Sequence, residues 1–183
     1  MKVLLVDDPR AKLPNLALMK LSAWHKARGD AVGFHVFDPD LIYVSCIFPR
    51  SRSQILSQLT FYPSAKKILG GYGFNDSKLP DEIEHLCPDY SLYGVDYSMG
   101  FTSRGCIRSC PWCIVPQKEG PIQDHAPLGE FLRHDKLILL DNNFLASPKW
   151  RENMGRLING KIAVNFNQGL DIRLIDQEVA HLL

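Results

Sequence analysis

The chain has 183 residues, 45% hydrophobic and 22% charged, which is the composition of an ordinary globular protein. Its length favours one domain or two small ones. Twenty-one Lys and Arg balance twenty Asp and Glu, so the formal charge is +1 and the basic excess typical of nucleic-acid binders is missing. No apolar run reaches the roughly 20 residues that cross a membrane.

Residues 1–75 have the pattern of an α/β domain. We expect strands at Lys2–Asp7, Ala31–Phe37, Leu41–Phe48 and Lys67–Leu69, with a helix capped by Asn15 and a second helix over Ser51–Phe61. Gly29 is well placed to end the first helix in a left-handed turn. This alternation of strands and helices predicts a sheet with largely parallel strands.

A second α/β pattern occupies residues 97–183. Between the two patterns, residues 76–96 are rich in Pro and Tyr and predict a linker. Strands are expected at Tyr97–Thr102, Leu137–Asp141 and Ile162–Phe166, and helices at Pro127–His134, at Pro148–Ile158 and after Asp176. The sequence stops inside this last amphipathic helix, so we expect an N-terminal fragment of a longer protein.

Three of the five cysteines fall within residues 105–116, GCIRSCPWCIVP, at Cys106, Cys110 and Cys113. The opening run KVLLVDD is too short and too acidic for a secretion signal, so we expect a cytoplasmic protein, in which thiols stay reduced. Clustered cysteines in that compartment bind metal more often than they form disulfides. The C-x3-C-x2-C spacing therefore predicts a metal site.

The number of ligands leaves two interpretations open. A structural zinc site closes with four protein ligands, and a ferredoxin-type cluster also takes four cysteines. Cys46 lies in an apolar strand and is expected to be an inert core thiol. Cys87 or His125 could supply the fourth ligand, and the chain would then be a non-catalytic zinc-binding module. Without a fourth ligand, three thiolates leave one metal position open, as in a reactive centre.

With Trp112 before the third cysteine and a strand before the loop, this motif resembles the signature of the radical S-adenosylmethionine superfamily, in its cobalamin-linked subgroup. The resemblance implies a 4Fe-4S cluster on the three cysteines, whose open iron binds S-adenosylmethionine. Reductive cleavage would give a 5′-deoxyadenosyl radical that abstracts hydrogen from substrate. It also implies that residues 97–183 form the first half of a partial (β/α)6 TIM-like barrel.

The same resemblance suggests further residues that contact the cofactor. Backbone near Trp112 would meet the adenine, and Asp141, Asn142 and Asn143 match a polar stretch that contacts the methionine amino group. An Asx turn with a helix cap explains these three residues equally well. Gln168 follows the third strand and could line the pocket, or lie in a solvated loop with Asp171 and Arg173. Arg104 and Arg108 could offset the cluster's negative charge, or be surface charges.

Residues 1–75 resemble the Rossmann-like cobalamin-binding domain that precedes many such barrels. Ligands of open α/β sheets bind beyond the carboxyl ends of the strands, so the loops after Asp7, Phe48 and Leu69 are the candidate place. Asp7-Asp8-Pro9-Arg10 replaces the motif with the lower histidine ligand. Cobalamin is possible, but a degenerate or substrate-handling domain is the better interpretation. The resemblance further implies a small-molecule or peptide substrate and an electron donor such as flavodoxin or ferredoxin.

Overall fold

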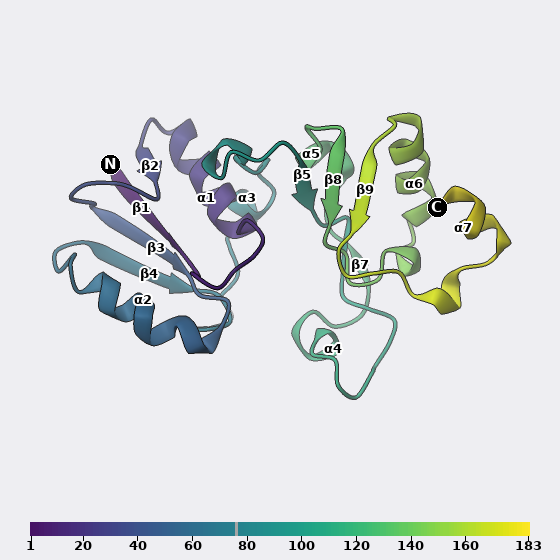
Figure 1. Ribbon diagram of the computed structural model, residues 1–183, viewed down its shortest axis with the longest axis horizontal. Coiled ribbons are helices and arrows are strands. Elements are labelled where there is room, and N and C mark those ends of the chain that lie inside the picture. Colours follow the sequence, from purple (N-terminus) through teal and green to yellow (C-terminus); the bar gives the residue numbers. More distant parts are fainter. Residues whose placement is uncertain (76) are drawn as a thin grey trace. The chain divides into compact units, whose positions relative to one another are not determined.

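The computed structural model describes residues 1–75 and 77–183, and the chain divides into two compact units, Met1–Gly94 and Val95–Leu183 (Figure 1). Each unit is built around a parallel sheet. The predicted α/β class and the parallel first sheet are therefore confirmed.

The first unit has a four-stranded parallel sheet in the order β2-β1-β3-β4. Its strands are β1 (Lys2–Asp7), β2 (Ala31–Gly33), β3 (Leu41–Ser45) and β4 (Lys66–Gly70). The helices are α1 (Leu16–Ala27), α2 (Arg52–Leu59) and α3 (Asp81–Glu84), with 3-10 turns η1 (Pro49–Ser51) and η2 (Tyr90–Leu92).

Alternate residues of β1 face two separate cores, as the period of a strand requires. Leu4 and Val6 pack in a cluster with Ile55 of α2. Val3 and Leu5 pack in a second cluster with residues of α1 and α3. The sheet is therefore covered on both faces, which explains why KVLLVD is an unbroken apolar run and does not alternate.

The first helix begins and ends as the sequence predicts. The Asn15 side chain accepts from the Leu18 backbone N–H at 3.3 Å, and Gly29 after the helix has φ +76°. Two strands are shorter than expected. The backbone turns at Asp38, with φ 52°, soon after β2, and the Ile47 and Phe48 N–H groups bond to Asp8, which ends β3 at Ser45.

Most of the predicted linker belongs to the first unit. The segment 76–96 begins at position 76, which lies outside the described residues, but α3 and η2 fall within it. Ile83 is buried in the cluster on the α1 side, and Leu79, Leu86 and Leu92 pack against it. These apolar side chains hold the segment to the sheet, and the boundary between units falls after Gly94.

The second unit has a parallel sheet in the order β5-β8-β9 and a two-stranded antiparallel pair, β6-β7. Its strands are β5 (Ser98–Gly100), β6 (Ser103–Arg104), β7 (Gln123–Asp124), β8 (Lys136–Leu139) and β9 (Ala163–Phe166). The helices are α4 (Val115–Lys118), α5 (Leu128–Phe131), α6 (Trp150–Asn159) and α7 (Gln177–Leu182), with 3-10 turns η3 (Phe144–Ala146) and η4 (Ile172–Leu174).

A single apolar cluster holds the second unit together. Leu137 and Leu139 of β8 pack with Met154 and Leu157 of α6 and with Val179 of α7. The three strands are parallel, so the segments after β5, β8 and β9 all leave from the carboxyl edge of this sheet (Figure 1). None of the helices in the described ranges is long and apolar enough to span a membrane.

Candidate functional site

The segment carrying the three cysteines is a loop closed at its base by the β6-β7 pair. Ser103 pairs with Asp124 and Arg104 with Gln123, and the backbone of His125 donates to the carbonyl of Thr102 at 2.9 Å. Residues 105–122 project from this stem, and we call them the cysteine loop. The loop follows the first strand of the second unit, as the sequence predicts.

Asp141, just after β8, fastens the stem to the sheet. One carboxylate oxygen accepts from the Thr102 N–H at 2.7 Å, and the other from the Ser103 N–H at 2.9 Å and from the hydroxyls of both residues at 2.6 and 2.7 Å. The side chain is buried, and burial raises the pKa of this carboxyl despite its four donors. Asp141 therefore builds the base of the loop.

Asn142 and Glu119 hold the two ends of the cysteine loop together. Glu119 accepts from the Asn142 side chain at 2.6 Å and from the Gly105 N–H at 3.0 Å, and it pairs with Arg104 at 3.1 Å. Gly105 has φ +79°, and a Cβ there would lie 2.2 Å from the carbonyl oxygen of Pro121. Only glycine fits this crossing of the chain.

Asn143 links the end of β8 to the first cysteine. Its side-chain nitrogen donates to Cys106 Sγ at 3.6 Å and to Asp171 at 3.4 Å. Its Oδ1 is buried and has no hydrogen-bond partner among the residues that the structure describes. Leaving such an acceptor unpaired costs about 1–3 kcal/mol. Such an oxygen could accept a hydrogen bond from a bound molecule only after the surrounding segment moves.

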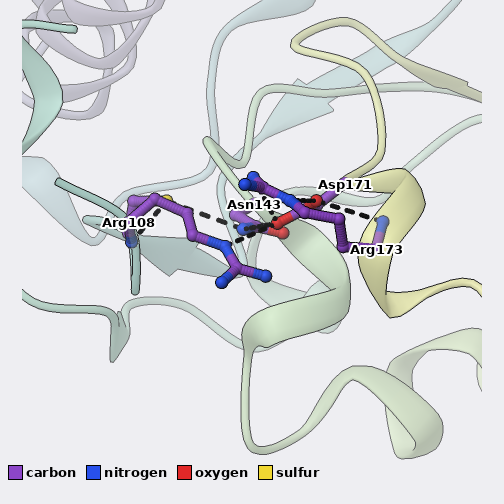
Figure 2. Close-up of polar contacts among 5 residues, drawn as sticks. Arg108, Asn143, Asp171 and Arg173 are labelled. Atoms are coloured by element: carbon purple, nitrogen blue, oxygen red, sulfur yellow. Dashed lines mark hydrogen bonds and ion pairs between the residues drawn. The ribbon is translucent and has the colours of Figure 1, made fainter. Parts of the chain in front are cut away.

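Asp171, in the segment after β9, gathers two arginines beside the cysteine loop (Figure 2). Arg108 Nε lies 3.0 Å from one carboxylate oxygen, and Arg173 Nε lies 2.7 Å from the other. The bond from Arg173, aided by Arg108, holds the pKa of the Asp171 carboxyl well below its usual range. The hydrogen bond to Asp171 and its negative charge raise the pKa of Arg173.

The three thiols themselves are not gathered. Each is partly buried, and the Cys113 N–H closes a turn on the Cys110 carbonyl at 3.0 Å. Within the described ranges, no group of three or more His, Cys, Asp or Glu side chains is close enough to hold a metal ion. The structure thus brings Cys106 to Asn143 but shows no formed metal centre.

The other predicted residues lie apart from this cluster of polar contacts. The Trp112 side chain is 87% exposed, and Gln168 is exposed in the segment after β9. The His125 ring meets the Phe101 ring edge-on, with centroids 6.2 Å apart, at the stem. Cys87 belongs to the first unit. Cys46 is fully buried, and burial raises the pKa of its thiol, as expected of an inert core cysteine.

The roles of three residues at the site were not recognised in the sequence. Asp171 and Arg173 also fit an exposed loop, and Glu119 carries no motif. The available signal was the Asp-x-Arg spacing in the segment that follows a strand whose end shares an edge with the cysteine loop.

Comparison with family models finds no match for this chain, and comparison with curated proteins finds none either. The case for any function therefore depends on the residues and contacts described above.

The corresponding edge of the first unit is filled by its own side chains. Asp8 is buried and accepts from the Ile47 and Phe48 N–H groups at 2.9 and 2.7 Å and from the Ser51 hydroxyl at 2.6 Å. Beside it, the Tyr93 hydroxyl donates to Asp7 at 2.6 Å. The place where an open α/β sheet binds its ligand is occupied by these bonds. The residues at this edge do not fit cobalamin.

Proposed function

We propose that the chain is a radical S-adenosylmethionine protein. In this proposal Cys106, Cys110 and Cys113 hold a 4Fe-4S cluster that binds S-adenosylmethionine for hydrogen abstraction from a small-molecule or peptide substrate. The electron comes from a donor such as flavodoxin or ferredoxin, in the cytoplasm. Strands β5, β8 and β9 are the first three of a partial (β/α)6 barrel, and the first unit is a Rossmann-like domain with a degenerate cobalamin-binding edge.

The observation that carries the proposal is the contact between Asn143 and Cys106. It joins the segment after the second parallel strand to the cysteine loop after the first, at 3.6 Å, and it leaves Asn143 Oδ1 buried and unpaired next to a thiol. A positively charged amino group is a donor that such an oxygen would accept. Three thiols on one loop, with an acceptor beside the first of them, are residue types suited to a cluster and an amino-acid ligand.

When bound, the cluster and S-adenosylmethionine would supply electron transfer and a 5′-deoxyadenosyl radical, which is chemistry that side chains cannot perform. The chain's own residues bind and orient. Asn143 would accept from the methionine amino group, and Arg108 and Arg173 would offset negative charge near Cys106. Trp112 would offer backbone near the adenine, and Gln168 would lie at the rim of the pocket.

Binding requires a local rearrangement, because the three thiols are not gathered in the structure. The stem, held by Asp141, and the crossing at Gly105, held by Glu119, can stay in place. The segment between Cys106 and Cys113 is the part that must close around the irons. We therefore expect cluster assembly to order this segment and to leave the sheet unchanged.

Anaerobic assembly with iron and sulfide tests the proposal. We expect about four irons per chain and broad visible absorption from a cluster of this type. Alanine at Cys106, Cys110 or Cys113 should abolish both signals. Alanine at Cys46 or Cys87 provides the matched control and should leave them intact. Addition of S-adenosylmethionine should then change the electron paramagnetic resonance spectrum of the reduced cluster.

The zinc-binding module predicts a different outcome of the same experiment. The protein would stay colourless and hold one zinc ion per chain, which would be lost on substitution of Cys87 or His125 as well as of the three loop cysteines. A cluster that forms but does not respond to S-adenosylmethionine would also refute the enzymatic proposal.

A further inference from the structure

We propose that Asp171 is a positioning residue that pins the cysteine loop and holds the side chains of Arg108 and Arg173 near Cys106. The inference rests on the proposed function only for its consequence at the cluster. The pinning itself belongs to the chain without any cofactor.

The geometry places Asp171 at the centre of the polar contacts around the loop (Figure 2). Its carboxylate accepts from Arg108 on the cysteine loop at 3.0 Å and from Asn143 after β8 at 3.4 Å. It also accepts from Arg173 at 2.7 and 3.1 Å. A single side chain from the third strand's loop therefore ties together the loops after the first and second strands.

The solvent exposure of the three charged side chains shows that Asp171 is the fixed partner to which the two arginines bind. The Asp171 side chain is 7% exposed, whereas those of Arg108 and Arg173 are 33% and 59% exposed. The arginines extend from solvent toward a buried carboxylate. An exposed arginine without such an anchor samples many rotamers, and its charge is screened by water. Asp171 thus fixes where the two positive charges lie.

These contacts surround the Cys106 sulfur. Its sulfur accepts from the Arg108 backbone N–H at 3.4 Å and from the Asn143 side chain at 3.6 Å. Asp171 accepts from the same Asn143 nitrogen and from the Arg108 guanidinium group. Donors and positive charges close to a thiolate-bound cluster stabilise its more negative, reduced form. Asp171 is itself negative, so its own charge lowers the reduction potential of the cluster, whereas the arginines that it holds raise that potential.

The first test uses the chain without a cofactor. Asp171→Asn keeps the size of the side chain and removes its charge, so amide hydrogen exchange in residues 105–113 should become about ten-fold faster. Glu178→Gln is the matched control, because it breaks an arginine–carboxylate pair of 2.8 Å with Arg151 on α6 and α7. Exchange in the loop should not change in this control. Unchanged exchange in the Asp171→Asn chain would overturn the pinning role.

The second test measures the reduction potential of the assembled cluster. Loss of a nearby negative charge alone would raise the potential, since it makes electron uptake easier. If Asp171 acts by holding the arginines, Asp171→Asn should lower the potential, in the same direction as Arg173→Gln. A rise would show a direct charge effect and would overturn the positioning role.

The two tests separate the failure of this inference from the failure of the proposed function. If no variant assembles a cluster, the enzymatic proposal fails, while hydrogen exchange still decides whether Asp171 pins the loop. If the cluster forms and responds to S-adenosylmethionine but exchange and potential do not move as stated, the enzymatic proposal stands and the role of Asp171 is refuted.

Discussion

Both units place an aspartate just after a central strand and use it to hold the segment that follows the neighbouring strand. Asp8 follows β1 and accepts from residues after β3, while Asp141 follows β8 and accepts from residues after β5. The backbone N–H of Arg10 also donates to Asp8. Each of the two carboxylates therefore accepts four hydrogen bonds. The same device thus occurs at the carboxyl edge of each parallel sheet.

The two edges differ in what the held segment does next. The segment that Asp8 holds continues into η1 and α2. At the same edge, Asn15 donates to Ser45 and Tyr93 donates to Asp7. At Asp141 the held residues begin a loop with three cysteines, and Asn143 keeps a buried oxygen unpaired. An edge whose polar groups are satisfied is scaffold. The edge with an unsatisfied acceptor is the better candidate for ligand binding.

The titration of the two aspartates differs as well. Burial acts to raise the pKa of each carboxyl group. At Asp8 the four hydrogen bonds together outweigh this effect, so the net pKa is lowered; their donors are Phe48, Ser51, Arg10 and Ile47. For Asp141 burial outweighs the bonds from Thr102 and Ser103, and the pKa is raised. Equal numbers of donors therefore do not give equal stabilisation of a carboxylate.

The largest expected effect comes from removing the anchor of the cysteine loop. Asp141→Ala leaves the buried N–H groups of Thr102 and Ser103 without their acceptor, which should cost about 3 kcal/mol of unfolding free energy. Asp124→Ala removes only the exposed pair with Lys149 and should cost less than about 1 kcal/mol. Hydrogen exchange in β5 and β8 measures both. Equal losses would show that Asp141 is no anchor.

The elements were predictable because apolar runs and caps are local signals. KVLLVD, the Asn15 cap and the LILLD strand are each fixed by residues a few positions apart. The packing of the predicted linker was not readable from the sequence, because Ile83 and Leu86 lie among prolines and only the fold shows that they pack on the α1 side. The cysteine motif located the loop that the β6-β7 pair closes. The pairing of Arg108 with Asp171 was not predictable, because these residues are 63 positions apart.

A smaller effect should separate two glycines of the cysteine loop. Gly105 and Gly120 both have positive φ, at +79° and +72°, but a Cβ at Gly105 would meet the Pro121 carbonyl, while at Gly120 it would meet open space. Gly120→Ala should therefore cost about 1 kcal/mol, the penalty of a left-handed residue. Gly105→Ala should cost at least about 2 kcal/mol, because the clash adds to that penalty. Urea unfolding compares the two, and equal costs would contradict the crossing of the chain at Gly105.

The smallest effect is a difference in pH dependence between the two edges. The lowered pKa of Asp8 means that its contribution to stability is present above the ordinary aspartate pKa of about 3.9 and is lost as pH falls through the folded-state pKa. Asp141 has a raised pKa, so its contribution is present below about 3.9 and is lost as pH rises through the folded-state value.

Asparagine at either position removes that titration. The stability difference between the unsubstituted chain and Asp8→Asn should therefore shrink as the pH is lowered, whereas the difference for Asp141→Asn should grow. Urea unfolding across the acidic range measures both slopes. Slopes of the same sign would mean that burial and hydrogen bonding shift the pKa values of Asp8 and Asp141 in the same direction. The aspartates of the two edges would then be electrostatically equivalent, and the cysteine loop and the unpaired oxygen of Asn143 would distinguish the candidate site from the scaffold edge.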